Sequence, residues 1–354
     1  MTTSLPDTML TAVLHKPLDV QLETKPLPEI GPADVLIKVM AVGVCGSDVH
    51  YYEHGRIGRY VVERPLILGH ECSGIVVAAG SQVKKLKVDD RVAIEPGVTC
   101  GRCEACKEGR YNLCPEVEFM ATPPVNGAFA QYIAHREDFV YPIPDHMSYE
   151  AAALIEPFSV GIHAASRAGL RPGASIAIMG MGPVGLMAVV AAKAFGAGTI
   201  IAADMAENRL EAARKLGATH TVQAAQADPV KAVFEYTGGK GADVAFETAG
   251  SPKALQAAVL SLKRGGALSI VGLPQQEGIS LPVPFIVDNE IDLYGIFRYA
   301  NTYEAGIRFL SSGIADVDAL VTDRYPLEQA GEAMERARTN KQGSIKVMVY
   351  PNGK

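Results

Sequence analysis

Long apolar runs are missing from this sequence. The longest, such as residues 186–192, fall far short of the roughly 20 residues that a helix needs to cross a bilayer. The N-terminal residues 1–22 also lack the basic start and apolar centre of a secretory signal. These absences predict a cytoplasmic protein with no membrane partner.

A basic surface is missing as well. The chain has 33 Lys and Arg against 39 Asp and Glu, which gives a net charge of -6, and the two signs alternate throughout. Nucleic acids and anionic membranes attract clustered positive charge, so neither is an expected partner. Hydrophobic residues make up 48%, with Gly 35 and Pro 22, as in soluble α/β proteins. We therefore expect a small-molecule partner.

Cysteine is scarce, with six residues in a chain that carries no export signal. This combination favours thiolate metal sites or free thiols over disulfides. Four of the six lie close together, as Cys100-x2-Cys103-x2-Cys106-x7-Cys114. Four thiols at such spacing suit a closed tetrahedral zinc, since Gly101 and Gly109 let the loop wrap around one ion. A closed site predicts a structural rather than a catalytic metal.

The length of 354 residues suggests two domains, and the local pattern changes near residue 156. Before that point short strand-like runs predict an antiparallel or barrel-like unit. These runs are residues 35–42, 74–79, 91–94 and 128–134. After it, predicted strands alternate with predicted helices, which is the rhythm of a doubly wound parallel sheet. The expected strands are 174–179, 199–203, 243–246, 267–271 and 291–296, and the expected helices are 151–168, 208–216 and 252–262. The closing segment predicts helices at 303–311 and 327–340 and a last strand at 344–350.

A glycine-rich turn follows the apolar run 174–179: Gly180-Met181-Gly182-Pro183-Val184-Gly185. Glycines at this spacing allow a tight turn, a close approach of backbone to pyrophosphate, and helix-on-strand packing. A strand-to-helix turn that binds nothing is the alternative. Roughly 20 residues on, Asp204 ends the next predicted strand, where a carboxylate can accept both ribose hydroxyls and repel a 2'-phosphate. NAD is therefore favoured over NADP, although Arg209 could pair with a phosphate, and Asp204 could instead cap a helix.

Further candidate ligands lie in two N-terminal segments, Cys45-Gly46-Ser47-Asp48-Val49-His50 and Gly69-His70-Glu71. A catalytic zinc uses about three N, S or O ligands and keeps one position open. In isolation, a buried Cys45 and a core His70 are the commoner situation.

The longer pattern Gly69-His70-Glu71-x2-Gly74-x5-Gly80-x2-Val83 resembles the zinc signature of the medium-chain alcohol dehydrogenase family. Within that family, residues 45–58 are similar to the first active-site loop of the sorbitol (polyol) dehydrogenases. Glu156-Pro157 and Phe297-Arg298-Tyr299 are similar to their substrate-facing segments. The resemblance covers nearly the whole chain.

The resemblance implies a GroES-like, β-rich catalytic domain of residues 1–157 and 297–354, and a Rossmann NAD-binding domain of residues 158–296. It implies reversible, zinc-assisted, NAD-dependent oxidation of a secondary hydroxyl of a sugar alcohol to a ketose by a homotetramer or homodimer. A threonine or general secondary-alcohol dehydrogenase is one alternative. A non-catalytic zinc- and NAD-binding relative is another.

The resemblance also implies residue roles. Cys45, His70 and Glu71 would hold the catalytic zinc, one of two zinc ions, with Glu156 ligating it directly or hydrogen-bonding its water. Ser47, His50 or the Glu156-bound water would relay the proton, with a solvated surface imidazole as the alternative for His50. Asp48 would accept the spare N–H of His70, and Cys72 would be a buried, inert thiol. The substrate would contact Tyr51, Ile57, Phe119, Glu156, Arg298 and Tyr299. NAD would contact Gly180, Gly182, Val184, Gly185, Asp204, Arg209, Gly272, Leu273, Phe297 and Arg298.

Overall fold

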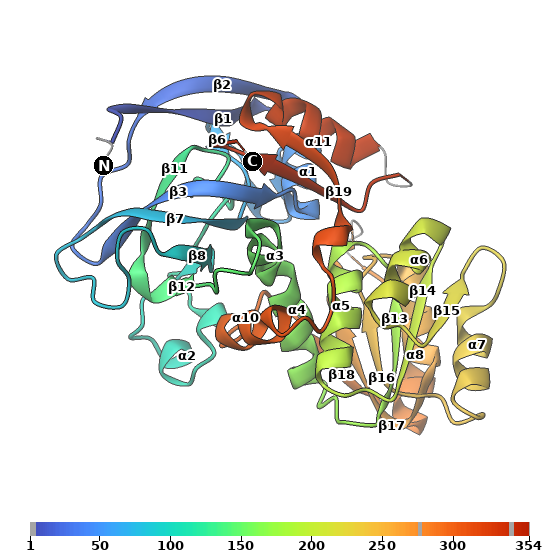
Figure 1. The fold of residues 1–354 in the computed structure, drawn as a ribbon. Helices are drawn as coiled ribbons and strands as arrows, with labels where there is room; N and C mark the ends of the chain where they lie inside the picture. Colours follow the sequence, from blue (N-terminus) through green and yellow to red (C-terminus); the bar gives the residue numbers. More distant parts are fainter. Residues whose placement is uncertain (1–4, 275–277, 340–342, 354) are drawn as a thin grey trace. The chain divides into compact units, whose positions relative to one another are not determined.

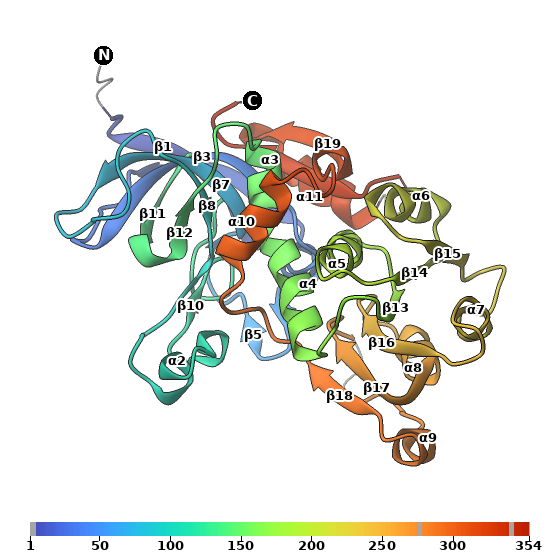
Figure 2. The same ribbon diagram turned by 60° about the horizontal axis from the view of Figure 1, so that its bottom comes forward.

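The computed structural model describes residues 5–274, 278–339 and 343–353, and the chain divides into two compact units (Figures 1 and 2). The first unit comprises Met1–Glu156 and Val317–Lys354, and the second comprises Pro157–Asp316. Residues 297–316, which we expected in the first domain, pack in the second unit. There Phe309 of helix α10 (Tyr303–Ser311) lies edge-on to Phe158, with ring centroids 6.4 Å apart. No helix in the described ranges is both long and apolar enough to cross a membrane.

The first unit is built on a seven-stranded sheet centred on the long strand β3 (Asp34–Gly43). Strand β3 pairs antiparallel with β7 (Glu71–Ala79), which leads outward to β8 (Arg91–Ile94) and β12 (Val140–Pro142). A second sheet joins β1 (Thr8–Lys16), β2 (Asp19–Pro26) and β6 (Leu66–Ile67). A continuous apolar core formed by both sheets fills the interior. The expected antiparallel unit is therefore present.

The predicted strand at residues 128–134 begins later, as β11 (Tyr132–Arg136), which pairs with β3. The preceding backbone takes other partners. The N–H groups of Gly127, Ala128 and Phe129 donate to the carbonyls of Ile67, Gly69 and Leu68 at 2.7–2.9 Å. These bonds hold the segment that leads into His70, so residues 127–129 support a site segment instead of extending the sheet.

The C-terminal segment returns to the first unit, as expected. Strand β20 (Lys346–Tyr350) pairs antiparallel with the end of β3 and parallel with β19 (Val321–Pro326). Helix α11 (Ala330–Thr339) packs on β20 and on helix α1 (Gly46–His54). The predicted helix reached residue 340, which lies outside the described residues. This return places the last strand beside the N-terminal segments that carry the candidate ligands.

The second unit holds a six-stranded parallel sheet in the order β15-β14-β13-β16-β17-β18. This order is that of the doubly wound nucleotide-binding fold, in which ligands bind at the carboxyl ends of the strands where the winding reverses. The reversal here lies between β13 and β16. The strand bounds are His220–Gln223, Thr199–Asp204, Ser175–Met179, Ala242–Glu247, Leu262–Ile270 and Asp292–Gly295.

Helices cover both faces of this sheet (Figures 1 and 2). Helix α5 (Pro183–Ala194) packs beside α6 (Glu207–Leu216), and α7 (Pro229–Tyr236) packs beside α8 (Pro252–Leu260). A short helix, α9 (Val283–Asp288), precedes β18. The sequence analysis did not identify β15 or α7, because His220-Thr221-Val222-Gln223 has little of the apolar run that marks a buried parallel strand.

Candidate metal and cofactor sites

Cys45 stands at the N-cap of helix α1, in extended backbone. Asp48, in the first turn of this helix, is completely buried. Its carboxylate accepts the backbone N–H of Cys45 and that of Gly69, each at 3.0 Å. One carboxylate thus ties the loop of Cys45 to the loop of His70, although the two are well separated in sequence.

His70 and Glu71 follow Gly69 directly, and both are buried where β7 begins. The Cys45 sulfur, a His70 ring nitrogen and a Glu71 carboxylate oxygen all lie within 4.8 Å of one another. Tetrahedral zinc with such ligands sets its donor atoms about 3.3–3.8 Å apart, so small adjustments would close this cluster around one ion. The donor set of sulfur, nitrogen and oxygen fits zinc.

Asp48 also faces His70, whose Nδ1 lies 3.6 Å from Asp48 Oδ1. Burial opposes ionisation of this carboxyl, but the His70 imidazole and the N–H groups of Cys45 and Gly69 hold its pKa below its usual range. An ionised carboxylate next to a ligating histidine orients the ring and fixes its tautomer. The position of Asp48 agrees with the role that we predicted for it.

A buried lysine that the sequence analysis missed adjoins this cluster. Lys346, at the start of β20, forms an ion pair with Glu71, and both side chains are 1% exposed. Its ammonium also donates to the carbonyl of Val44 at 3.0 Å. A lysine in the apolar stretch Val347-Met348-Val349 was a visible signal, but the sequence offered no way to identify its partner.

Glu156 lies in the first turn of helix α4 (Ile155–Arg167) and is buried. The negative charge of Glu156 helps to raise the pKa of Cys72 and that of Glu95. Burial is the main cause that raises the pKa of the Cys72 thiol to about 12; His70 opposes this shift, whereas Glu156 and Glu71 contribute to it. Cys72 is therefore a buried thiol of low reactivity, as expected. Ser47 and His50 are both partly exposed on α1.

Besides Glu156, three predicted substrate contacts lie in the first unit. Phe119 is buried, with its ring centroid 5.6 Å from that of His70. Tyr51 belongs to the core, and burial raises its pKa to about 12 even though a hydrogen bond with Thr122 favours the ionised form. Ile57 packs on the edge of the same core. Phe119 thus offers an apolar surface directly beside a candidate ligand.

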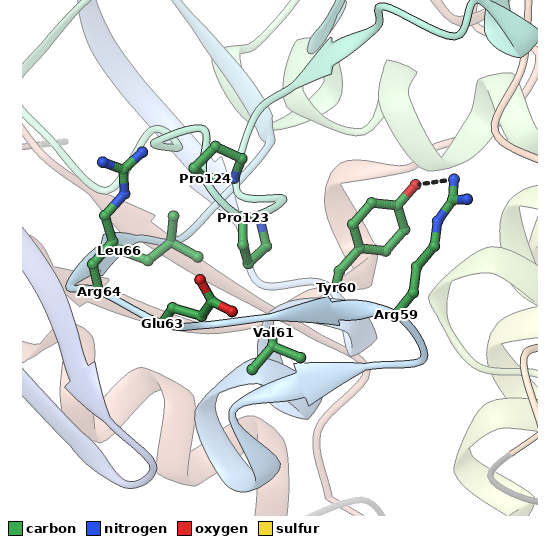
Figure 3. Close-up of a pocket in the computed structure, with 8 residues that line it drawn as sticks. All are labelled: Arg59, Tyr60, Val61, Glu63, Arg64, Leu66, Pro123 and Pro124. Carbon is green, nitrogen blue, oxygen red and sulfur yellow. Dashed lines mark hydrogen bonds between the residues drawn. The ribbon is translucent and has the colours of Figure 1, made fainter.

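A pocket of about 500 Å³ opens around strand β5 (Tyr60–Val61) and the Pro123-Pro124 segment (Figure 3). The guanidinium of Arg59 donates to the Tyr60 hydroxyl at 3.0 Å on one side of it. Its lining is Arg59, Tyr60, Val61, Glu63, Arg64, Leu66, Pro123 and Pro124. None of the residues predicted from the sequence as site residues is among them.

The four clustered cysteines come together in one loop of the first unit. Cys100 Sγ lies 3.5 Å from Cys114 Sγ and 4.0 Å from Cys106 Sγ, and all four ligand atoms lie within 4.8 Å of one another. All four are free thiols. Gly101 and Gly109 adopt φ of 68° and 74°, the left-handed backbone that glycine tolerates best. The loop therefore has the donor set of a closed zinc site.

A buried carboxyl anchors this loop to the sheet. Glu95, which follows β8, accepts the hydroxyls of Tyr111, from the cysteine loop, and Tyr141, from β12, each at 2.9 Å. Burial raises the pKa of Glu95 to about 7 although both hydroxyls favour the ionised form. The sequence analysis did not identify this residue, because its two partners are identifiable only in the folded chain.

The glycine-rich turn connects β13 to α5 in the second unit. Gly180 has φ of 102°. A β-carbon at Gly185 would overlap the Gly180 carbonyl, whereas one at Gly182 would meet nothing within 4 Å. These environments match the roles of the glycines in a dinucleotide turn: a tight bend, close helix–strand packing, and open space for a ligand.

Asp204 ends β14 next to this turn. Its Oδ2 accepts the backbone N–H of Met181 at 2.6 Å, and its Oδ1 accepts that of Ala206 at 2.9 Å. Arg209 NH1 lies 4.0 Å from the same carboxylate. Helix α6 has Ala206 at its N-cap, so the alternative of Asp204 as the helix cap does not hold.

Two further residues organise the carboxyl ends of β13, β16 and β17. Thr248 donates its hydroxyl to the Gly180 carbonyl at 2.7 Å. The buried Glu247 accepts the N–H of Ala249 at 2.8 Å, and a β-carbon at Gly272 would press on Glu247 and Gly250. The sequence analysis named Gly272 but neither of these supporting side chains. The next residue, Leu273, is 72% exposed.

Phe297, Arg298 and Tyr299 follow β18 in the second unit. Arg298 has φ of 54°, and its guanidinium lies 4.7 Å from the Phe297 ring centroid. Tyr299 is buried, with its ring 5.8 Å from that of Tyr303. Because these residues belong to the second unit and the candidate metal ligands to the first, their substrate contacts stay a prediction.

Comparisons with known proteins agree with this division of the chain. The model of the alcohol dehydrogenase GroES-like domain matches residues 31–145, and that of the zinc-binding dehydrogenase family matches residues 183–312. Sorbitol dehydrogenase from Bacillus subtilis (strain 168) is 65% identical over 352 residues, which are 99% of this chain and 100% of that protein. Sorbitol dehydrogenase from Bos taurus is 44% identical over 96% of this chain and 95% of its own length.

Solved structures show the same fold. An oxidoreductase/dehydrogenase of unknown specificity involved in membrane biogenesis, from Escherichia coli, superimposes with a TM-score of 0.92 and 40% identity, over 97% of this chain and 99% of its own. The match to the sorbitol dehydrogenases extends over both units of the chain. The chain belongs to the zinc-dependent medium-chain dehydrogenase family, in its sorbitol dehydrogenase subgroup.

Proposed function

We propose that this protein catalyses the reversible, NAD-dependent oxidation of a secondary hydroxyl of a sugar alcohol, such as sorbitol or xylitol, to the ketose. The observation that carries the proposal is the meeting of Cys45, His70 and Glu71 within 4.8 Å, in a chain 65% identical to a sorbitol dehydrogenase. A structural protein needs neither three metal donors gathered in one unit nor a dinucleotide turn in the other.

Two zinc ions per chain fit the residues present. Cys45, His70 and Glu71 would hold the catalytic ion, with Glu156 as direct ligand or as hydrogen-bond partner at the open position. Cys100, Cys103, Cys106 and Cys114 would hold a structural ion. When bound, the catalytic zinc supplies Lewis acidity toward the substrate hydroxyl and NAD serves as hydride acceptor.

The cofactor is proposed to be NAD, bound at the turn Gly180, Gly182, Val184 and Gly185. Asp204 would accept hydrogen bonds from the ribose hydroxyls there. These would replace the bonds that its carboxylate accepts from the backbone N–H groups of Met181 and Ala206. Its negative charge disfavours the 2'-phosphate of NADP. Arg209, Gly272, Leu273, Phe297 and Arg298 would complete the site.

The chain's own residues handle the proton and orient the substrate. Ser47 and His50, partly exposed on α1, would pass a proton from the candidate metal cluster to solvent, a role that suits imidazole near neutral pH. Phe119 and Ile57 would form an apolar wall. Tyr51, Glu156, Arg298 and Tyr299 would provide donors and acceptors for the other hydroxyls of the polyol.

The protein is proposed to work in the cytoplasm as a homotetramer or homodimer, with a small molecule as its substrate. The mixed charge of the chain, 33 Lys and Arg against 39 Asp and Glu, favours a small molecule over a nucleic acid as its partner.

A substrate panel tests the proposal. We would measure kcat/KM for sorbitol, xylitol, ribitol, L-arabinitol, galactitol, threonine and 2-butanol, each with NAD and with NADP, and identify the product of the best polyol by NMR. We expect a polyol with NAD to exceed 2-butanol by at least about 100-fold, because a site built for several hydroxyls rejects analogues that lack them.

The product must be a ketose, since the proposal concerns a secondary hydroxyl. Threonine or 2-butanol as the best substrate would refute the polyol assignment in favour of another zinc dehydrogenase. One zinc per chain and no turnover of any alcohol would indicate the non-catalytic relative instead.

A further inference from the structure

The buried lysine next to the metal cluster needs a physical reason. Lys346 is 1% exposed, and removing an ammonium from water costs several kcal/mol unless it is paired and hydrogen-bonded. It is paired with the carboxylate of Glu71 and donates to the Val44 carbonyl at 3.0 Å. Both acceptors belong to the candidate metal site: Val44 precedes the candidate ligand Cys45, and Glu71 is itself a candidate ligand.

The surrounding backbone leaves the lysine little freedom. Val44 donates its N–H to the carbonyl of Val347 at 2.9 Å, so β20 is fixed beside the segment that leads into Cys45. On the other side, Gly43 pairs with Glu71 across β3 and β7. A β-carbon at Gly43 would overlap the Glu71 carboxylate and the Lys346 side chain. The absence of a side chain at Gly43 is therefore what admits the ion pair.

We propose that Lys346 is a positioning residue for the metal centre. By holding one carboxylate oxygen of Glu71, it leaves the other oxygen for the metal and limits Glu71 to one orientation. Its bond to Val44 keeps Cys45 at a matching distance. The C-terminal strand, more than 270 residues after Glu71 in sequence, thus completes a site whose proposed ligands all lie in the N-terminal part of the chain.

The inference rests on the proposed zinc site but not on the proposed substrate. Supporting residues around a metal commonly alter its affinity by about 10–100-fold when they are replaced. If the lysine only stabilised the fold, its replacement would lower the free energy of unfolding without changing how the metal is held. The two roles differ in metal retention and in the spectrum of the metal.

The test uses the full-length, metal-loaded protein. We would measure zinc released to a chromogenic chelator and the visible absorption of the cobalt-substituted protein, for wild type, Lys346→Met and Lys346→Arg. Arg324→Met is the matched control. Arg324, on the neighbouring strand β19, pairs bidentately with Glu150, with both bonds at 2.9 Å, and the contacts described for it do not include the proposed ligands.

We expect Lys346→Met to release one of two zinc ions at least about tenfold faster than wild type and to change the cobalt spectrum. Lys346→Arg, which keeps the charge, should restore part of the retention. Arg324→Met should lose stability and still hold both ions as wild type does. If the wild-type protein oxidises no polyol, the proposed function is refuted. Metal loss in Lys346→Met would then still support this inference.

Wild-type retention and spectrum in folded Lys346→Met would overturn the inference, as would equal metal loss in Arg324→Met. If Lys346→Met does not fold, Lys346→Gln replaces it, because the amide keeps a donor for Val44 and removes the charge. Failure of both neutral variants to fold, with full metal retention in Lys346→Arg, would assign the lysine a folding role only and refute the inference.

Discussion

The two candidate metal-binding regions of this protein are built in opposite ways. The four cysteines lie between Cys100 and Cys114 in one loop. The second cluster collects Cys45 from the start of α1, His70 and Glu71 from the start of β7, and Lys346 from the last strand. The first therefore needs a few local turns, whereas the second needs three segments paired in the correct register.

This difference favours different roles for the two proposed metals. A loop with few apolar residues would gain order mainly from an ion, so a metal bound there would contribute to folding. The dispersed cluster is held by the sheet, by Asp48 and by Lys346, so a metal bound there would be free to serve chemistry. We expect loss of a metal from the cysteine loop to reduce stability, and loss of a metal from the dispersed cluster to reduce activity.

Cys45→Ser should have the largest effect. It removes a thiolate from the dispersed cluster, so we expect loss of one zinc and about a 10³-fold fall in kcat/KM for the polyol, equivalent to several kcal/mol of transition-state stabilisation. Zinc analysis and steady-state kinetics measure both. Cys72→Ala is the control and should keep two zinc ions. A Cys45→Ser protein with two zinc ions and near-normal activity would remove the distinction between the clusters.

Cys100→Ser should affect stability instead. We expect loss of the other zinc and a decrease of several kcal/mol in the free energy of unfolding, with activity remaining in the folded fraction. Urea denaturation and zinc analysis would measure this. Arg102→Ala, an exposed change in the same loop, should leave both unaltered. Unchanged zinc content and stability in Cys100→Ser would contradict the closed-site prediction.

Arg298→Ala tests whether the second unit contributes to substrate recognition. We expect transition-state binding, calculated from kcat/KM, to weaken by roughly 2–4 kcal/mol for a five- or six-carbon polyol and by much less for 2-butanol. Only the polyol has additional hydroxyls that the substitution leaves unpaired. Arg308→Ala, an exposed arginine of the same unit, is the control. If both alcohols slow equally, the polyol role of Arg298 fails. Glu156→Ala should slow both.

Glu95→Gln tests how the cysteine loop is attached to the sheet. Burial raises the pKa of Glu95 from 4.5 to about 7, so the folded protein keeps this proton at pH values where the unfolded chain has lost it. Its contribution to stability is thus fully present below about pH 4.5 and is lost as the pH rises to about 7, by at most about 3 kcal/mol.

In Glu95→Gln, which has no carboxyl at this position, the decrease in the free energy of unfolding should disappear. The difference between the values at pH 5 and pH 8 should therefore be smaller in the variant than in the wild type. Urea denaturation at the two pH values measures it. Glu118→Gln, at an exposed position in the same unit, is the control. An unchanged pH dependence in Glu95→Gln would mean that the carboxyl is ionised in the folded protein well below pH 7.

Asp204→Ser combined with Met205→Arg should have the smallest effect. We expect the preference for NAD over NADP, expressed as a free energy from the ratio of the two kcat/KM values, to fall by roughly 1–3 kcal/mol. The variant lacks the carboxylate that would bond the ribose hydroxyls of NAD and repel the phosphate of NADP. Met205 is exposed, so an arginine fits there. Asp228→Ser, which alters a helix cap elsewhere in the same unit, should leave the ratio unchanged.

Local patterns carried most of what the sequence could predict. The alternation of strands and helices after residue 156 and the glycine turn at residues 180–185 depend on neighbours within a few residues. The cysteine spacing likewise predicted that Cys100, Cys103, Cys106 and Cys114 would meet, because a short loop limits how far apart they can be. The strand β15 was missed since its polar sequence lacks the apolar run of a buried strand.

The sequence by itself determined the two types of fold, the local cysteine cluster and the glycine turn, because spacing along the chain sets their geometry. Only the tertiary structure decided that Lys346 meets Glu71, that Glu95 joins Tyr111 to Tyr141, and that residues 297–316 pack in the second unit. Each of these depends on strand pairing or packing between segments far apart in sequence. A buried charge reveals its partner only when the backbone that surrounds it is in place.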